Sequence, residues 1–489
     1  MDLTRQLPED VLADVLRRVA PCGLAACRCA CKALRAIIDA HRLLRADLLP
    51  LSVGGIFIDF HSELLSEFFA RPSTRPAISG RLDYLPRPND YHGSRDSYTI
   101  EDHCNGLLLL DRDDTYYVVN PATRQWDPLP TRPSTFKEED PGFVYQQYLV
   151  FDPMLSPHYE VFLIPHPCFK SRPGEYNYNM SGDELDPIME ESEWPPSVCA
   201  LHVFSSRSGC WEERSFIRQG KAARTIADMP RYEWYDKHYG VYYGGALYVH
   251  CKTDFVMRIY LSNNRYEVIK PPMDTELSDC QNLRLGRSEK GLYFASTWLD
   301  EQYPSTSNLY HLLVWILEES CGRQNWVLKH NKCLPPILDY DRHVLGPWVL
   351  QDINFNVYVK EYKEHNEHRS YMENMIEKKS ELNSSKKEPV EEKFEWDSEN
   401  DNILYKDERC VGRGDGHIGI LGFHPYKEII FLDVSIYRGL AYHLKDSKVQ
   451  DLGYLYPTSY YLALPNDRFI TGSFSYTPCW LGHQKATRM

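Results

Sequence analysis

Four cysteines near the start of the chain are the first residues whose type and spacing could do chemistry. Cys22, Cys27, Cys29 and Cys31 lie close together, and thiolates are good zinc ligands. Structural zinc sites usually take their ligands as close pairs that are separated by a longer loop. Here the cysteines fall along a predicted helix, and no histidine lies nearby. The sequence therefore predicts packed thiols and no metal site.

A glycine-rich stretch and two His–Cys pairs could indicate cofactor binding or nucleophilic catalysis. Residues 414–419 have the letters of a dinucleotide fingerprint, but they run into the apolar strand predicted at 418–423. The helix amino terminus that would bind a phosphate is therefore missing. The pairs at 103–104 and 166–168 lack a converging acid or base. We predict no cofactor, no catalytic residue and a role other than that of an enzyme.

The charge of the chain restricts the partners that it can have. Its 489 residues carry a net charge of −14, which argues against general binding to nucleic acid phosphates and to anionic membrane surfaces. The sequence has no stretch of about 18 apolar residues that could span a bilayer. We expect a cytoplasmic and/or nuclear protein, in which the 14 cysteines are reduced and packed as small hydrophobic residues.

Residues 1–46 differ from the rest of the chain in amino-acid composition and charge. They contain no aromatic residue, and they hold eight Lys or Arg against five Asp or Glu, a charge of +3. Pro8 is suited to the start of a helix, and an apolar stripe follows it at Val11, Leu12, Val15, Leu16 and Val19. A second helical pattern runs from Leu24 to Ile38. This segment is too small to be very stable alone, so we expect it to pack on a partner.

The sequence of most of the remaining chain predicts short strands and turns. Aromatic residues reach 13% and prolines number 32, which favours strands over long helices. Five hairpins share a loose unit, in which an apolar strand, a polar turn and a second strand with a large side chain follow one another. They lie at 116–126, 201–211, 255–269, 312–328 and 440–452. Such irregular repetition indicates the blades of a β-propeller, with an irregular β-sandwich as the alternative.

These patterns predict a multidomain α + β protein, with a small helical domain followed by an all-β, propeller-like domain. We expect the helical domain at 1–46, a linker or loop-rich segment at 47–98 and the β domain at 99–489. Residues 361–400 hold seven basic and twelve acidic residues and no glycine. This composition is typical of a solvated insertion that is partly helical or disordered.

The helical domain resembles an F-box in the stretches Leu7–Leu16 and Leu24–Arg35, where a Leu-Pro pair, a Cys-Lys pair and a following Arg keep the order and spacing of that family. The resemblance implies binding to a Skp-type adaptor, which joins a cullin and a RING protein. F-boxes often carry Trp where this chain has Leu34, and Leu buries less apolar area. The positions that match adaptor contacts are Leu7, Pro8, Leu12, Val15, Leu16, Leu24, Cys31, Lys32, Leu34 and Ile37.

The β domain resembles the kelch-like, F-box-associated domain of plant F-box proteins, at 104–110 and at 119–126. We interpret the residues of this signature as core and turn residues. The two resemblances together imply the substrate receptor of a cullin–RING ubiquitin ligase, whose β domain binds a target protein. The alternatives are a propeller-type carbohydrate binder or enzyme, an F-box protein that acts outside a ligase, and a helical segment that merely caps the β domain. Aromatic loops at 193–196 and 232–235 are candidates for target contact, with simple burial of their rings as the alternative.

Overall fold

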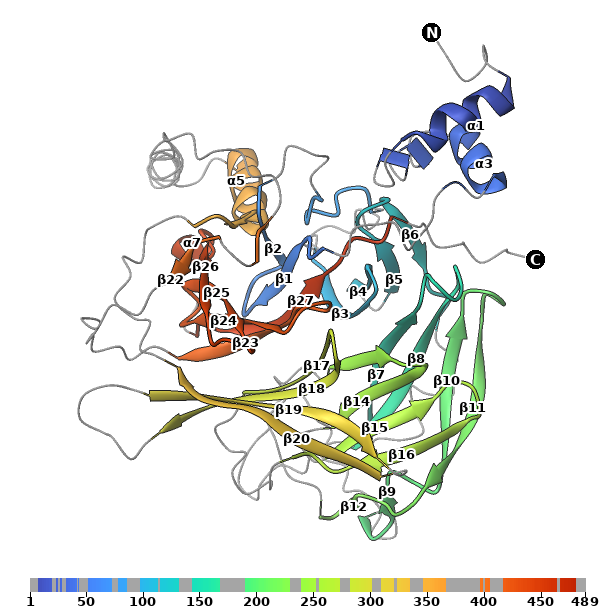
Figure 1. The fold of residues 1–489 in the computed structure, drawn as a ribbon, viewed down its shortest axis with the longest axis vertical. Coiled ribbons are helices and arrows are strands. Elements are labelled where there is room, and N and C mark those ends of the chain that lie inside the picture. Colours follow the sequence, from blue (N-terminus) through green and yellow to red (C-terminus); the bar gives the residue numbers. More distant parts are fainter. Residues whose placement is uncertain are drawn as a thin grey trace.

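The computed structural model describes a helical module at the amino end and a large β domain (Figure 1). The helices of the module are α1 (Glu9–Arg17) and α3 (Lys32–Ala40), and residues 23–24 and 27–28 are helical as well. Among the described residues, no helix has the length and apolar character needed to cross a membrane. The residues described are 8–19, 23–24, 27–28, 32–41, 43, 52–72, 78–85, 97–112, 115–131, 143–167, 190–228, 239–251, 255–272, 282–300, 309–320, 323–334, 346–365, 396–398, 401–404, 417–463 and 467–480.

Helix α1 begins where the sequence predicts it. Pro8 occupies the position before the first helical residue, and Glu9 and Asp10 fill the first turn. Proline suits this end because the first backbone N–H groups have no partner within the helix. The acidic side chains lie near the positive end of the helix dipole, and Arg17 lies in the last turn, so both ends carry favourable charges.

Six blades of antiparallel strands form a ring in the described part of the β domain, and the propeller prediction is confirmed. Each innermost strand contacts the innermost strand of the next blade, and the sixth contacts the first. These strands are β3 (Thr99–Cys104), β7 (Phe143–Phe151), β13 (Gly240–Tyr243), β17 (Asn282–Ser288), β23 (Ile418–Phe423) and β27 (Ile470–Tyr476).

The outer strands follow behind each innermost strand. They are β4 (Leu107–Arg112), β5 (Thr115–Asn120) and β6 (Gln125–Pro128) behind β3; β8 (Tyr159–Pro167), β10 (Val198–Ser205) and β11 (Cys210–Gln219) behind β7; β14 (Ala246–Cys251), β15 (Phe255–Tyr260) and β16 (Arg265–Ile269) behind β13; β18 (Gly291–Asp300), β19 (Leu309–Ser320) and β20 (Arg323–Leu334) behind β17; β24 (Ile429–Val434), β25 (Arg438–His443), β26 (Val449–Tyr454) and β22 (Ile403–Leu404) behind β23; and β1 (Gly55–Phe60), β2 (Glu67–Ala70) and β21 (Val349–Leu350) behind β27. The outermost strands β11 and β16 pair in parallel, so two neighbouring blades share one continuous sheet.

The ring is closed by strands from opposite ends of the chain. Strand β27 pairs with β1, with Phe57 opposite Phe474 and Gly55 opposite Tyr476. Every residue of β1 is buried. Strands β1 and β2 lie inside the segment 47–98 that was expected to be a linker or loop-rich. This part of the segment therefore contributes strands to the β domain, and the partner of β1 at the other end of the chain could not be inferred from a local pattern.

The five predicted hairpins are present, as β5–β6, β10–β11, β15–β16, β19–β20 and β25–β26. In the first of them, the buried Asn120 accepts hydrogen bonds from the backbone of Ala122 and Thr123. Its amide also donates to the Cys479 carbonyl at 2.9 Å. The Asn-Pro turn is therefore held in place by the end of the closing strand.

The signature stretch at 104–110 spans the end of one strand and the start of the next. Strand β3 ends at Cys104 and β4 begins at Leu107, with Asn105 and Gly106 at positive φ angles of 47° and 88° between them. An Asn-Gly pair is typical of a two-residue hairpin turn, because both residues adopt positive φ at little cost. This turn joins the first two strands of its blade.

The predicted charged insertion begins within a helix. Helix α5 (Ile353–His365) runs into the range 361–400, and residues 366–395 lie outside the described part of the chain. The fully buried carboxylate of Glu67, on β2, accepts hydrogen bonds from the backbone N–H groups of Ile353 at 2.7 Å and Asn354 at 2.8 Å. These hydrogen bonds to the first backbone N–H groups of the helix tie α5 to the closing blade.

Burial raises the pKa of Glu67 to about 8, from an ordinary value of 4.5, and the charge of Asp352 adds to the rise. The folded protein therefore holds a proton that the unfolded chain has lost above pH 4.5. The resulting stabilisation is complete below that pH and disappears as the pH rises through about 8.

We expect the thermal midpoint of the full chain to fall by roughly 3–8 °C between pH 5.5 and 8.5 because of this proton. Glu67→Gln, which cannot ionise, should lose most of that pH dependence. The control Glu318→Gln changes an exposed carboxylate and should retain it. Equal slopes in differential scanning fluorimetry for the wild type and Glu67→Gln would contradict the assignment.

Candidate adaptor-docking site in the helical module

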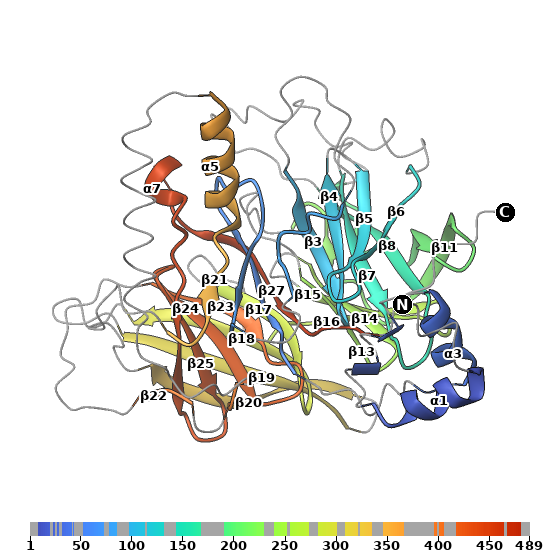
Figure 2. The same ribbon diagram turned by 90° about the horizontal axis from the view of Figure 1, so that it is seen from above.

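The helical module has a small apolar core of its own. Leu12 and Leu16 of α1 pack with Leu24 and with Ile38 of α3, and all four are at most 8% exposed. Spacing of four residues places Leu12 and Leu16 on one face of α1. Helix α3 supplies the facing surface, as Figure 2 shows. These leucines hold the two helices together.

A second apolar face of α1 has no partner among the described residues. Val11 is 45% exposed and Val15 is 50% exposed, and the two valines are one helical turn apart. Pro8, exposed at the start of the helix, lies one turn before Val11. An exposed apolar stripe on a small helical module is the kind of surface that a partner protein covers. We call Pro8, Val11 and Val15 the valine face.

The positions that the resemblance assigns to the adaptor divide into three groups in the structure. Leu7 and Cys31 lie outside the described residues. Pro8, Val15 and Lys32 are exposed, and Leu34 and Ile37 are half-buried against the core. Leu12, Leu16 and Leu24 are buried within the module. They pack beneath the exposed residues and do not lie at the surface themselves. Contact between each position and an adaptor stays a prediction.

Val11 is the residue of this face that the predicted contacts omit. The sequence signal was present, because an apolar stripe of five residues is wider than the single side that a neighbouring helix can cover. Only the position of α3 shows that Leu12 and Leu16 face inward while Val11 and Val15 face outward.

Polar contacts at the surface of the module connect its helices. Arg17 donates to Asp14 within α1, and His41 Nε2 lies 3.3 Å from the carboxylate of Glu9. The second contact joins the first turn of α1 to the residue after α3. Exposed pairs of this kind contribute about 0–1 kcal/mol each, so the buried leucines dominate the stability of the module.

The other residues that were weighed for chemistry are structural where they are described. Cys27 is half-buried against the core of the module, while Cys22, Cys29 and Cys31 lie outside the described residues. In the described part of the chain, no three His, Cys, Asp or Glu side chains gather as a metal site would require. Burial raises the pKa of Cys104 to about 12, which makes its thiol a poor nucleophile.

The remaining candidates lie in the β domain. His166 is buried, with Nε2 at 3.1 Å from the Tyr148 hydroxyl. Residues 418–423 form β23, as expected for a strand after the glycine-rich stretch. Trp194, a candidate for target contact, is 6% exposed and belongs to the core, because the loop turns its ring onto Phe143. The other aromatic loop, at 232–235, lies outside the described residues.

Comparison with known families bears directly on the helical module. Residues 5–46 match the model of the F-box domain. This segment is an F-box domain. The family match covers α1, α3 and the valine face, and it agrees with the boundary of 46 that the sequence suggests.

A relative extends the similarity into the β domain. An F-box protein of Arabidopsis thaliana is 24% identical over 317 residues, which cover 61% of this chain and 63% of the relative. The chain therefore spans less than two thirds of the length of that F-box protein. F-box domains generally bind Skp1-type adaptors in cullin–RING ligases, so the valine face of this F-box domain is its candidate docking surface.

Proposed function

We propose that this chain is the substrate-recognition subunit of a cullin–RING ubiquitin ligase of the SCF type. The F-box domain would bind a Skp-type adaptor, and the β-propeller would bind a target protein. The observation that carries the proposal is an F-box domain at residues 5–46 whose first helix exposes Val11 and Val15. The relative from Arabidopsis thaliana, itself an F-box protein, supports the same reading.

The proposed mechanism is proximity. A receptor that holds a target beside a ubiquitin-charged enzyme raises the effective concentration of the target's lysines there. Such a role needs a rigid platform and no reactive side chain of its own. The closed ring supports this proposed role, because a propeller is a rigid scaffold that holds its surface loops in place.

The proposal includes the extents of the domains and the place of action. We assign the F-box to residues 1–46 and start the β domain at β1, since β1 and β2 belong to the closing blade. The kelch-like relationship of this domain to plant F-box-associated domains is part of the proposal. So are a cytoplasmic or nuclear location and an F-box-independent contact with the target.

The decisive test is co-purification with the adaptor. The full chain and a chain without residues 1–46 are each mixed with a purified Skp-type adaptor and captured. We expect recovery of the adaptor to fall at least tenfold in the truncated chain, since the F-box carries the docking surface. Proteins that both chains retain from a plant extract would be candidate targets. Equal recovery of the adaptor by both chains would refute the proposed function.

A further inference from the structure

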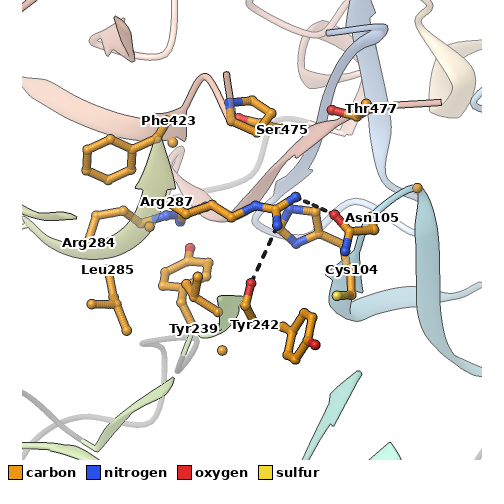
Figure 3. A pocket seen from close by; sticks show the side chains of 17 residues that line it. Cys104, Asn105, Tyr239, Tyr242, Arg284, Leu285, Arg287, Phe423, Ser475 and Thr477 are labelled. Atoms are coloured by element: carbon orange, nitrogen blue, oxygen red, sulfur yellow. Dashed lines mark hydrogen bonds between the residues drawn. The ribbon is translucent and has the colours of Figure 1, made fainter. Parts of the chain in front are cut away.

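The centre of the propeller holds a cavity of about 80 Å³. Its walls come from five of the six innermost strands or their ends, namely β3, β13, β17, β23 and β27. A cavity of this size has room for several water molecules or for one small polyatomic ion. Figure 3 shows that two arginines of β17, Arg284 and Arg287, dominate its polar lining.

Arg284 is 6% exposed, and its described partners are all neutral. Its Nη2 donates to the Ser473 carbonyl and, at 3.4 Å, to the Leu421 carbonyl. Its guanidinium carbon lies 3.3 Å from the centre of the Tyr239 ring. These contacts fix the side chain between three blades, but carbonyls and an aromatic ring leave its positive charge without a counter-ion.

Arg287, also on β17, is half-buried, and its described hydrogen-bond partners are neutral as well. Its Nη2 donates to the side-chain oxygen of Asn105, and its Nη1 lies 3.5 Å from the Tyr242 carbonyl. Neither arginine forms an ion pair with a carboxylate among the described residues. The carboxylate of Asp102, on β3, accepts from the Leu149 backbone at 2.7 Å and does not line the cavity.

Three neutral polar atoms of the lining have no partner. His103 Nδ1, Ser475 Oγ and Thr477 Oγ1 are all buried without a hydrogen-bond partner among the described residues. Burial and the charges of Arg284 and Arg287 lower the pKa of His103 to about 3, against a hydrogen bond to the Ser475 backbone that favours the protonated ring. The ring is therefore neutral at pH 7, and its single N–H is directed to that backbone. Buried polar atoms are seldom left unpaired unless they meet a ligand or water.

Buried charges in proteins are normally paired, because an unpaired charge loses its hydration without compensation. Here the buried guanidinium of Arg284, the half-buried guanidinium of Arg287 and three unpartnered polar atoms surround a small cavity. Guanidinium groups bind phosphate and carboxylate oxygens through two hydrogen bonds at once. We propose that the centre of the propeller binds one oxyanion group of the size of phosphate, with Arg284, Arg287 and the hydroxyls of Ser475 and Thr477 as its ligands.

This inference is independent of the F-box and of the ligase role. The test uses the full chain at pH 7.5, with inorganic phosphate or acetate titrated against chloride at constant ionic strength. We expect a saturable rise in the thermal midpoint and a matching heat in isothermal titration calorimetry. A preference for phosphate would identify a phosphoryl ligand, and a preference for acetate would identify a carboxylate ligand. A response to neither anion beyond that to chloride would overturn the proposal.

Variants separate this site from general anion effects. Arg287→Gln should weaken binding at least about tenfold, since it removes one charge-assisted contact. Without phosphate it should be no less stable than the wild type, because an unpaired charge is gone. Arg265→Gln, a change at an exposed arginine of β16, should bind phosphate like the wild type. Unchanged affinity in Arg287→Gln would overturn the proposal.

Ser475→Asp gives a second and opposite readout. Its carboxylate would occupy the cavity as a built-in anion, raise the thermal midpoint in chloride and remove the response to phosphate. A Ser475→Asp chain that folds and still binds phosphate as tightly as the wild type would refute the site, even where Arg287→Gln fails to fold.

Discussion

Replacing Val11 and Val15 together by aspartate lowers the affinity for a Skp-type adaptor at least about a hundredfold and leaves the F-box domain folded. Burial of one valine side chain contributes about 1.5–3 kcal/mol, and two unpaired carboxylates in an interface oppose binding further. Both valines are about half exposed in the free chain, so the helices do not depend on them. Surface plasmon resonance with purified adaptor measures the affinity, and circular dichroism checks the helices.

Two variants serve as controls for this experiment. Val198→Asp makes the same change at a valine of β10 that is 56% exposed, and it should leave adaptor binding unchanged. Leu16→Asp places a charge in the core of the module, where the side chain is 4% exposed. This variant should unfold the two helices, as measured by circular dichroism. If the Val11 and Val15 double variant bound the adaptor within about threefold of the wild type, the valine face would not be the docking surface.

Removing residues 470–489 abolishes cooperative unfolding of the β domain. The deletion takes away β27, the innermost strand of the closing blade. Phe474 and Tyr476 are at most 1% exposed, and loss of each such aromatic side chain costs about 3–5 kcal/mol. Together with the lost strand pairing, this cost is comparable with the whole stability of a domain, about 5–15 kcal/mol.

A chain that ends at Trp480 is the matched control, because it keeps β27 and should unfold like the full chain. Calorimetry of the three chains measures the cooperative transition, and light scattering reports the aggregation expected of an open ring. A transition in the 1–469 chain within a few degrees of the wild type would show that the other five blades suffice.

Local patterns in the sequence predicted much of the fold. The hairpin at 116–126, for example, was evident from apolar strands around an Asn-Pro turn, and the first helix was evident from Pro8 and the apolar spacing after it. Such features depend on neighbours a few residues away, which the sequence shows directly. The turn at Asn105 and Gly106 was not predicted, although that dipeptide favours a hairpin turn.

Features that depend on distant contacts were not predictable in this way. The partner of β1 is β27, at the other end of the chain, and no local pattern links Phe57 to Phe474. The valine face required the position of α3. The residues that line the cavity come from separate strands, so His103, Arg284 and Ser475 become neighbours only when the ring is closed.

The closure of the ring by β27 also sets an order of events during synthesis. The F-box leaves the ribosome first, whereas β1 must wait until β27 has been made, more than 400 residues later. At about 5–20 residues per second, this delay is on the order of tens of seconds. Throughout that interval β1, which is buried along its whole length in the folded protein, can pair with β2 on one side but lacks its strand partner on the other. A nascent chain can therefore hold a complete helical module before its β domain is closed, and the open edge of β1 is exposed to wrong strand pairing until synthesis ends.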